Sequence, residues 1–229
     1  MTRGVLVALA GAALLSASPL RAQNRAEGRV VRIAGSDTLA VPGAPVVLHR
    51  VGPDRQGPID TTITAHDGRF RFRFPPDTTA TFLLSTRYAG IEYFSRPVAV
   101  ATGIDTALTV IVADTSSAQP VSVAQRTILI SQADESGTRI VLDWFVLRNA
   151  GTLTRVAPDT TRAAWSTPLP EAAQNVELAD SRQSQFAAEA LAFRGDSALV
   201  FAPISPGDKE LLLQYRIPAG LRRFVVPAR

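Results

Sequence analysis

The chain has 229 residues, of which 46% are hydrophobic, and a formal net charge of +4 at pH 7. This hydrophobic content excludes an intrinsically disordered chain, and the length is enough for one or two domains with their own cores. The absence of cysteine excludes disulfide bonds, a thiol nucleophile and a cysteine-ligated metal. The basic residues are dispersed and all but Lys209 are arginines or histidines, so the composition argues against nucleic-acid binding.

The first 22 residues have the pattern of an export signal. Met1-Thr2-Arg3 supplies the positive start, residues 4–18 are an apolar run, and the small residue Ala22 precedes Gln23. A membrane anchor is the alternative, but the run is shorter than the roughly 20 residues of a spanning helix. We therefore predict a signal peptide over 1–22, cleaved near Ala22. The mature chain is expected to have no transmembrane segment and to be periplasmic or secreted.

Residues 26–113 contain seven runs of strand character, separated by turn residues. The clearest is Arg69–Phe74, in which Arg and Phe alternate strictly after the turn dipeptide Asp67-Gly68. Successive strand side chains point to opposite faces, so the phenylalanines are expected to be buried and the arginines exposed. Seven short strands with one-sided patterning predict an antiparallel β-sandwich. The seven runs are 28–33, 45–50, 59–64, 69–74, 81–88, 91–101 and 106–112.

Residues 113–120 are small and polar, which predicts a linker with a domain boundary near residue 116. Beyond it, runs 121–131 and 138–148 form a predicted hairpin around residues 134–137. Apolar residues occupy both faces of 138–148, which indicates a central strand. Prolines interrupt residues 152–182, where a short helix is expected over 171–178 by propensity. Strand character returns at 186–193, 198–204 and 210–217, so a second β-sandwich is predicted.

The first half also carries a family pattern. It consists of an opening strand at Gly28-Arg29-Val30-Val31, a Pro/Gly-marked turn into an apolar strand over 41–48, Thr62-Ile63-Thr64, the hairpin Asp67-Gly68-Arg69-Phe70, and Tyr88. Residues 26–113 thus resemble the carboxypeptidase regulatory-like domain, a transthyretin-like β-sandwich. The resemblance implies a fold and no activity, because such domains are appended to peptidases, outer-membrane receptors and surface proteins.

The predicted architecture is all-β, with two consecutive β-sandwich domains over 24–115 and 119–229. The first is expected to be transthyretin-like with about seven strands, and residues 1–22 are the signal peptide. The apolar run 221–226 close to the C-terminus is expected either to be a final edge strand or to continue into a longer parent protein.

Residues able to carry catalysis are few. His49 and His66 are the two histidines, and neither begins a His-x-x-Glu zinc motif, because Gly52 and Arg69 stand three residues further on. We predict structural roles for both, and no catalytic, cofactor-binding or metal-binding residue. Several acids lie in predicted turns, where local backbone hydrogen bonding is the expected role and calcium binding the alternative. These acids are Asp54, Asp67, Asp105, Asp134, Glu135 and Asp208.

Asp143 is unusual because it lies inside an apolar strand. A buried carboxylate is costly unless it is paired, so an ion pair with Arg126 or Arg148 is predicted. The alternative is a hydrolase with an unfamiliar carboxylate site, which would need a second acid beside Asp143 in an open cleft.

Two groups of side chains are candidates for a binding surface. Tyr88, Tyr93 and Phe94 flank a hairpin at Ala89-Gly90 and could stack on a sugar or grip a peptide if exposed together; packing across the sheet is the alternative. The face formed by Arg69, Arg71 and Arg73 could receive an acidic partner, although such rows are usually solvated.

The function expected from these patterns is that of an exported, non-enzymatic β-sandwich protein, without a cofactor, that mediates protein or glycan interactions in the bacterial cell envelope. Its mechanism would be surface complementarity or strand addition at an exposed edge. The alternative is an accessory domain pair of a larger peptidase or membrane machine. The functional part would then lie on another chain or beyond the C-terminus.

Overall fold

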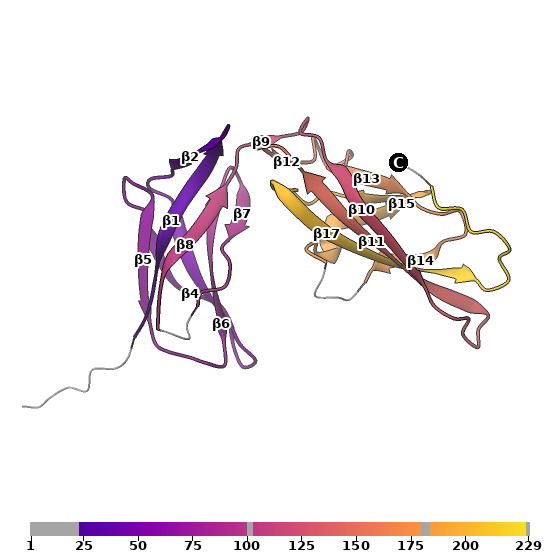
Figure 1. Ribbon diagram of the computed structural model, residues 1–229, viewed down its shortest axis with the longest axis horizontal. Coiled ribbons are helices and arrows are strands. Elements are labelled where there is room, and N and C mark those ends of the chain that lie inside the picture. The colour runs from indigo at the N-terminus through magenta and orange to yellow at the C-terminus, as the bar shows by residue number, and fades with distance from the viewer. Residues whose placement is uncertain (1–22, 100–102, 180–183, 228–229) are drawn as a thin grey trace, which may run out of the picture.

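The computed structural model describes residues 23–99, 103–179 and 184–227, so the predicted signal peptide lies outside the described residues. Within these ranges nearly all regular structure is β-strand, and a single 3-10 turn, η1, covers Ala188–Ala190. Two groups of strands follow one another along the chain (Figure 1). The predicted all-β fold is therefore confirmed. No helix of the described part is long and apolar enough to cross a membrane.

The N-terminal sandwich is built from two sheets. In the first, β1 pairs antiparallel with β2 and β5 and parallel with β8; in the second, the order is β4-β3-β6-β7. All seven predicted runs are strands, and β2 is an additional short strand. The strands are β1 (Asn24–Ala34), β2 (Asp37–Ala40), β3 (Pro45–Val51), β4 (Gln56–Ile63), β5 (Arg69–Phe74), β6 (Thr81–Tyr88), β7 (Ile91–Phe94) and β8 (Ile104–Val112).

The alternation of β5 places its phenylalanines in the core between these sheets. Phe70, Phe72 and Phe74 are at most 5% exposed, and they pack with residues of β3, β6 and β8. The turn before the strand forms as expected, because Asp67 Oδ1 accepts a hydrogen bond from the backbone N–H of Arg69. Gly68 adopts a φ of +76°, and a Cβ there would lie 2.6 Å from the carbonyl oxygen of Val30. The dipeptide is thus required by both backbone conformation and close packing.

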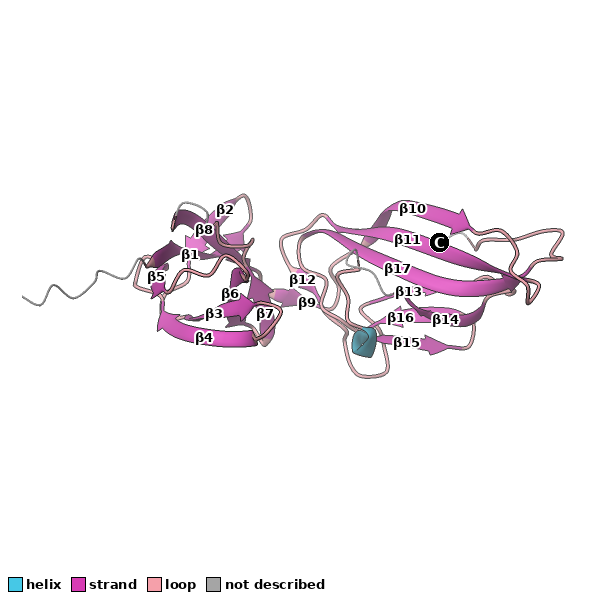
Figure 2. Ribbon diagram, turned by 90° about the horizontal axis from the view of Figure 1, so that it is seen from below, coloured by secondary structure: helices cyan, strands magenta, loops and turns pink. Residues whose placement is uncertain are grey.

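The C-terminal sandwich stacks the sheet β10-β11-β17-β14 on the smaller sheet β13-β16-β15 (Figure 2). The core between them includes Phe145 and Trp165, whose rings meet edge to face at 5.6 Å. β11 lies between β10 and β17, which confirms the predicted central strand. The strands are β10 (Ser122–Ile130), β11 (Thr138–Asn149), β13 (Trp165–Pro168), β14 (Gln174–Leu178), β15 (Leu191–Arg194), β16 (Ser197–Val200) and β17 (Gly207–Pro218).

Three predicted elements differ from the structure. The helix expected over 171–178 is wrong, because Gln174–Leu178 pairs with β17 as a strand, an edge position that outweighs local propensity. The strand expected over 186–193 begins only at Leu191, after η1. The strand expected over 91–101 ends at Phe94, three residues before Pro97, which has no N–H to donate to a ladder; residues 100–101 lie outside the described part.

The segment predicted to be a linker is bonded to the C-terminal sandwich. Thr115–Ser116 forms β9, which pairs in parallel with β12 (Thr154–Arg155). The buried hydroxyl of Tyr93 donates to the carbonyl oxygen of Ala113 at 2.9 Å and lies 2.8 Å from Thr154 Oγ1. The separate hydrophobic cores lie on either side of this junction, while the predicted boundaries 24–115 and 119–229 stay predictions.

The junction predicts a contrast between two tyrosines. Tyr93→Phe leaves buried polar groups without their partner, so we expect the free energy of unfolding to fall by about 1–3 kcal/mol. Tyr88→Phe is the matched control, because Tyr88 donates at 2.7 Å to Asp114, whose side chain is 46% exposed and can bind water instead. Chemical denaturation of both variants measures the difference. Equal losses would show that the Tyr93 hydroxyl does not stabilise the junction.

Candidate functional site

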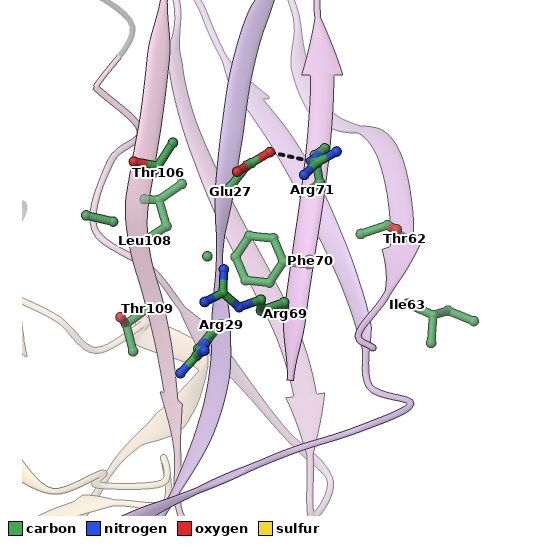
Figure 3. Close-up of a pocket in the computed structure, with 12 residues that line it drawn as sticks. Glu27, Arg29, Thr62, Ile63, Arg69, Phe70, Arg71, Thr106, Leu108 and Thr109 are labelled. Atoms are coloured by element: carbon green, nitrogen blue, oxygen red, sulfur yellow. Dashed lines mark ion pairs between the residues drawn. The ribbon is translucent and has the colours of Figure 1, made fainter. Parts of the chain in front are cut away.

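A basic groove of about 750 Å³ crosses the outer face of the sheet that holds β5, β1 and β8. The charged side chains in it come from β1 and β5, and hydroxyl groups come from β4 and β8 (Figure 3). We call it the basic groove, and the residues that define it are Glu27, Arg29, Arg69, Arg71, Thr106 and Thr109.

The register of β1 and β5 sets the charges of the groove. Arg29 lies directly opposite Arg69, and Arg25 lies opposite Arg73, so two pairs of like charges face one another across the strands. Directly opposed like charges destabilise a sheet unless something compensates for them. Between these two pairs, Glu27 lies opposite Arg71. The arrangement therefore has positive charge at both ends and one acid at its centre.

Glu27 forms ion pairs with two arginines. It forms an ion pair with Arg25 at 2.5 Å and another with Arg71 across the strands (Figure 3). The hydrogen bond from Arg25, with the nearby charge of Arg71, holds the pKa of the Glu27 carboxyl below its ordinary value. The acid is therefore ionised at neutral pH and fully engaged with its neighbours.

The remaining charges of this face are unbalanced. Asp67 pairs with Arg69 at 3.1 Å, while Arg29 and Arg73 make no ion pair among the described residues. The five arginines at positions 25, 29, 69, 71 and 73 carry +5 against −2 from Glu27 and Asp67, which leaves a net charge of +3. Such a surface attracts anions from solution.

A glycine in the lining of the groove lets β1 and β8 approach each other closely. At Gly28, between Glu27 and Arg29, a Cβ would lie 2.1 Å from the carbonyl oxygen of Leu108 on β8. A bulge in the pairing of β1 with β8 brings the two backbones this close. Any larger residue would push β8 away from β1.

The structure separates the two predicted groups of binding residues. Arg69, Arg71 and Arg73 are exposed on one face of β5 as predicted; Arg69 and Arg71 line the basic groove, and Arg73 continues the same row beside it. Arg25 and Arg29 were not singled out from the sequence, although the alternation Arg-x-Glu-x-Arg over 25–29 marks them as one strand face.

The aromatic group does not form one exposed platform. Tyr93 is only 6% exposed, because its ring belongs to the core and its hydroxyl lies at the junction. Tyr88 is half-buried, and only Phe94, 57% exposed, presents its ring to solvent. Of the two alternatives, packing within the sheet holds for Tyr93 and joint exposure does not, since alternation along β7 turns Tyr93 inward while Phe94 faces outward.

Asp143 has the arginine partner predicted for it. Arg126 donates to both carboxylate oxygens, Nε at 2.9 Å and Nη2 at 2.6 Å, and the hydroxyl of Tyr215 donates at 3.2 Å. The Asp143 side chain is 1% exposed, so it does not lie in an open cleft. This geometry contradicts the alternative of a hydrolase centred on Asp143.

The histidines provide one further contact of interest. His49 Nε2 lies 2.8 Å from Ser85 Oγ, a pairing that resembles a nucleophile with its base. Ser85, however, is completely buried, and Phe94 stands opposite it on β7 with its ring 6.1 Å from that of His49. A substrate cannot reach this hydroxyl, so the contact is structural. His66 lies exposed in the turn before Asp67.

Five of the six turn acids named from the sequence form ion pairs with arginine. This engagement satisfies them without a cation, and no group of three or more potential metal ligands occurs within residues 23–99, 103–179 and 184–227. The pairs are Asp54–Arg50, Asp67–Arg69, Asp105–Arg96, Asp134–Arg216 and Asp208–Arg148.

Comparisons with known proteins add little to this geometry. No family model and no curated protein matches the chain. Among solved structures it is similar to the major pilin subunit of Bacillus cereus, with 12% identity over 86% of this chain and a TM-score of 0.25. The match spans 60% of the length of the pilin chain.

A second similar structure is a candidate carbohydrate-binding protein from Bacteroides uniformis. The identity is 11%, the match covers 86% of this chain and 79% of the other, and the TM-score is 0.20. Likenesses this weak carry no argument about function, which must come from the site itself.

Proposed function

We propose that the protein is an exported, non-enzymatic β-sandwich protein that binds an acidic, extended segment of another protein in the bacterial cell envelope through the basic groove. The observation that carries the proposal is the register that sets Arg29 against Arg69 and Arg25 against Arg73. The export pattern of residues 1–22 supports the location. The resemblance of residues 26–113 to carboxypeptidase regulatory-like domains supports a role as an appended binding domain.

The spacing of the arginine pairs favours a ligand with several acids. The two pairs lie four residues apart along β1, a separation of roughly 13 Å at strand geometry. A carboxylate between the members of each pair would relieve their mutual repulsion and accept charge-assisted hydrogen bonds from both. A single small anion can satisfy only one of the pairs.

The backbone of β5 favours a peptide over other polyanions. Val30 N–H donates to the carbonyl of Gly68, and Ala65 N–H donates to that of Arg69. By the alternation of antiparallel pairing, even-numbered residues of β5 face β1 and odd-numbered ones face away. The backbone groups of Arg71 and Arg73 therefore point to the open edge of the sheet, where an extended segment can add as a strand.

The lining of the groove gives less support to a glycan. Phe70 is the one aromatic residue in the lining, and it is 5% exposed because its ring belongs to the core. A sugar would thus find hydroxyl groups and guanidinium groups but no ring on which to stack.

We expect poly-L-glutamate to bind the mature protein and the two opposed arginine pairs of β1 and β5 to determine the affinity. In the double variant Arg29→Ala/Arg73→Ala, we expect the Kd for polyglutamate to rise about tenfold for each arginine removed. Each substitution removes one charge-assisted hydrogen bond at a solvated site, and a loss of this size corresponds to about tenfold in affinity. Isothermal titration calorimetry at two salt concentrations measures this. Raising the salt should weaken binding, because the groove is exposed.

The control is Arg55→Ala/Arg87→Ala, which removes two exposed arginines outside the groove. Its Kd should stay within about twofold of the parent value. Polygalacturonate is titrated in parallel. Tighter binding of this acidic glycan than of polyglutamate would overturn the choice of a peptide, and equal losses in both double variants would overturn the groove as the site.

A further inference from the structure

A second cavity, more apolar than the basic groove, lies between the two sandwiches. It has a volume of about 910 Å³, and its walls come from β1, β7 and β8 on one side and from the segments around η1 and β17 on the other. We call it the junction cleft. Its lining includes the apolar residues Phe94, Ile111 and Phe186 and the cation Lys209.

The walls of the junction cleft are held in place by hydrogen bonds. β9 pairs with β12 across the junction, and Tyr93, which also lines the cleft, bonds to Ala113 and Thr154. Two apolar side chains in the lining remain open to solvent, since Phe94 is 57% and Ile111 is 51% exposed. The cleft thus leaves apolar surface available between two connected walls, the usual setting of a small-molecule site.

Lys209 supplies the cleft with a single unpaired cation. It is the only lysine of the chain, it is half-buried, and its ammonium makes no hydrogen bond or ion pair among the described residues. Its sequence neighbour Asp208 is fully engaged, because Arg148 donates to both of its carboxylate oxygens at 2.8 and 2.7 Å. Burial lowers the pKa of the Lys209 ammonium, because it disfavours the charged form. An anionic partner would stabilise that charged form.

The other charged residue in the lining, Glu92, is not an ion-pair partner of Lys209. Glu92 is exposed on β7, where it lies directly opposite Arg87 of β6, so its charge is offset on its own sheet. The junction cleft therefore combines an extended apolar wall with one cation that lacks a counterion.

We propose that the junction cleft binds a molecule with a single carboxylate and an apolar body, such as a long-chain aliphatic carboxylate. The carboxylate pairs with the ammonium of Lys209, and the aliphatic chain lies against Phe94, Ile111 and Phe186. This site is distinct from the basic groove, whose charged side chains come from β1 and β5 and which takes several acids at once; Thr109 of β8 borders both.

The test uses dodecanoate below its micelle concentration, titrated into the mature protein by calorimetry. We expect saturable binding that strengthens about fourfold for each methylene added between decanoate and dodecanoate, because the chain is buried. Lys209→Gln should weaken dodecanoate binding about tenfold, and Lys209→Arg should keep it within about threefold. Dodecyltrimethylammonium, which carries the opposite charge, should bind the parent no better than it binds Lys209→Gln.

Two controls separate this site from the rest of the molecule. Arg55→Gln removes an exposed charge that lines neither site, and Arg29→Ala/Arg73→Ala removes one arginine from each opposed pair of β1 and β5; neither should change the affinity for dodecanoate. Circular dichroism confirms that each variant is folded. An affinity of Lys209→Gln within twofold of the parent would overturn the proposal, as would a loss of dodecanoate binding in Arg29→Ala/Arg73→Ala.

The single lysine offers a second, spectroscopic readout. Reductive methylation with ¹³C-formaldehyde gives one dimethyl-lysine signal for the chain, apart from the N-terminal amine. Dodecanoate should shift that signal saturably, with the Kd found by calorimetry. A signal unmoved at saturating dodecanoate would show that the carboxylate does not reach Lys209.

Discussion

Replacing Arg126 by Met is expected to lower the free energy of unfolding of the C-terminal sandwich by about 3–5 kcal/mol, the usual cost of leaving a buried charge without its partner. Asp143 is 1% exposed and receives both of its guanidinium hydrogen bonds from Arg126. The hydrogen bond to Asp143 raises the pKa of Arg126, so the guanidinium stays charged. Arg126 also packs over the ring of Phe145, 4.6 Å from its centroid, and donates to the carbonyl of Pro227.

The measurement is simple because Trp144 and Trp165 both lie in the C-terminal sandwich. Tryptophan fluorescence during urea denaturation therefore reports the unfolding of that sandwich alone. Arg148→Met is the matched control, since its ion pair with Asp208 has side chains that are 52% and 45% exposed. We expect it to cost no more than about 1 kcal/mol.

A second variant tests the reason for the loss. In Arg126→Met/Asp143→Leu the buried charge is absent, so most of the lost stability should return, because apolar replacement of a whole buried pair is often neutral. Tyr215 then loses its acceptor, a smaller cost. A double variant as unstable as Arg126→Met would show that the ion pair is not what destabilises the single variant.

Local patterns in the sequence were enough to predict much of this fold. The alternation in β5 identified a buried phenylalanine face and an exposed arginine face, because side-chain direction in a strand follows from sequence position alone. The apolar character of both faces of β11 identified a central strand. The cost of burying Asp143 was enough to predict an arginine partner, and Arg126 was one of two named.

Features that depend on long-range pairing were harder to predict. Residues Gln174–Leu178 favour a helix locally, and only the free edge of β17 makes them a strand. The hydroxyl of Tyr93 bonds to Ala113 and Thr154 at the junction, a role that no pattern within β7 reveals.

The candidate site illustrates the same limit. Its arginines are visible in the sequence, but the opposition of Arg29 to Arg69 depends on the register between strands 40 positions apart along the chain, which no local pattern contains. The junction cleft depends on how two separate sandwiches are joined, so its lining could not be assembled from the sequence.

The phenylalanine and arginine faces of β5 predict opposite effects of neighbouring substitutions. Phe72→Ala removes a ring that is 2% exposed from the N-terminal core, and we expect a loss of about 3–5 kcal/mol in the free energy of unfolding. Arg73→Ala changes the next residue on the exposed face, where no ion pair is lost, and should cost less than about 0.5 kcal/mol. Differential scanning calorimetry measures both losses. Hydrogen exchange in β1 and β5 assigns them to the N-terminal sandwich.

The same pair of variants separates stability from binding. If the basic groove binds an acidic segment, Arg73→Ala should weaken polyglutamate binding about tenfold at nearly parental stability. Phe72→Ala should reduce stability while the protein that remains folded binds with nearly parental affinity, because the ring contributes no surface to the groove. A large stability loss in Arg73→Ala would mean that this arginine supports the sheet itself. The exposed row on β5 would then be a structural feature, and the case for the groove as a binding site would fail.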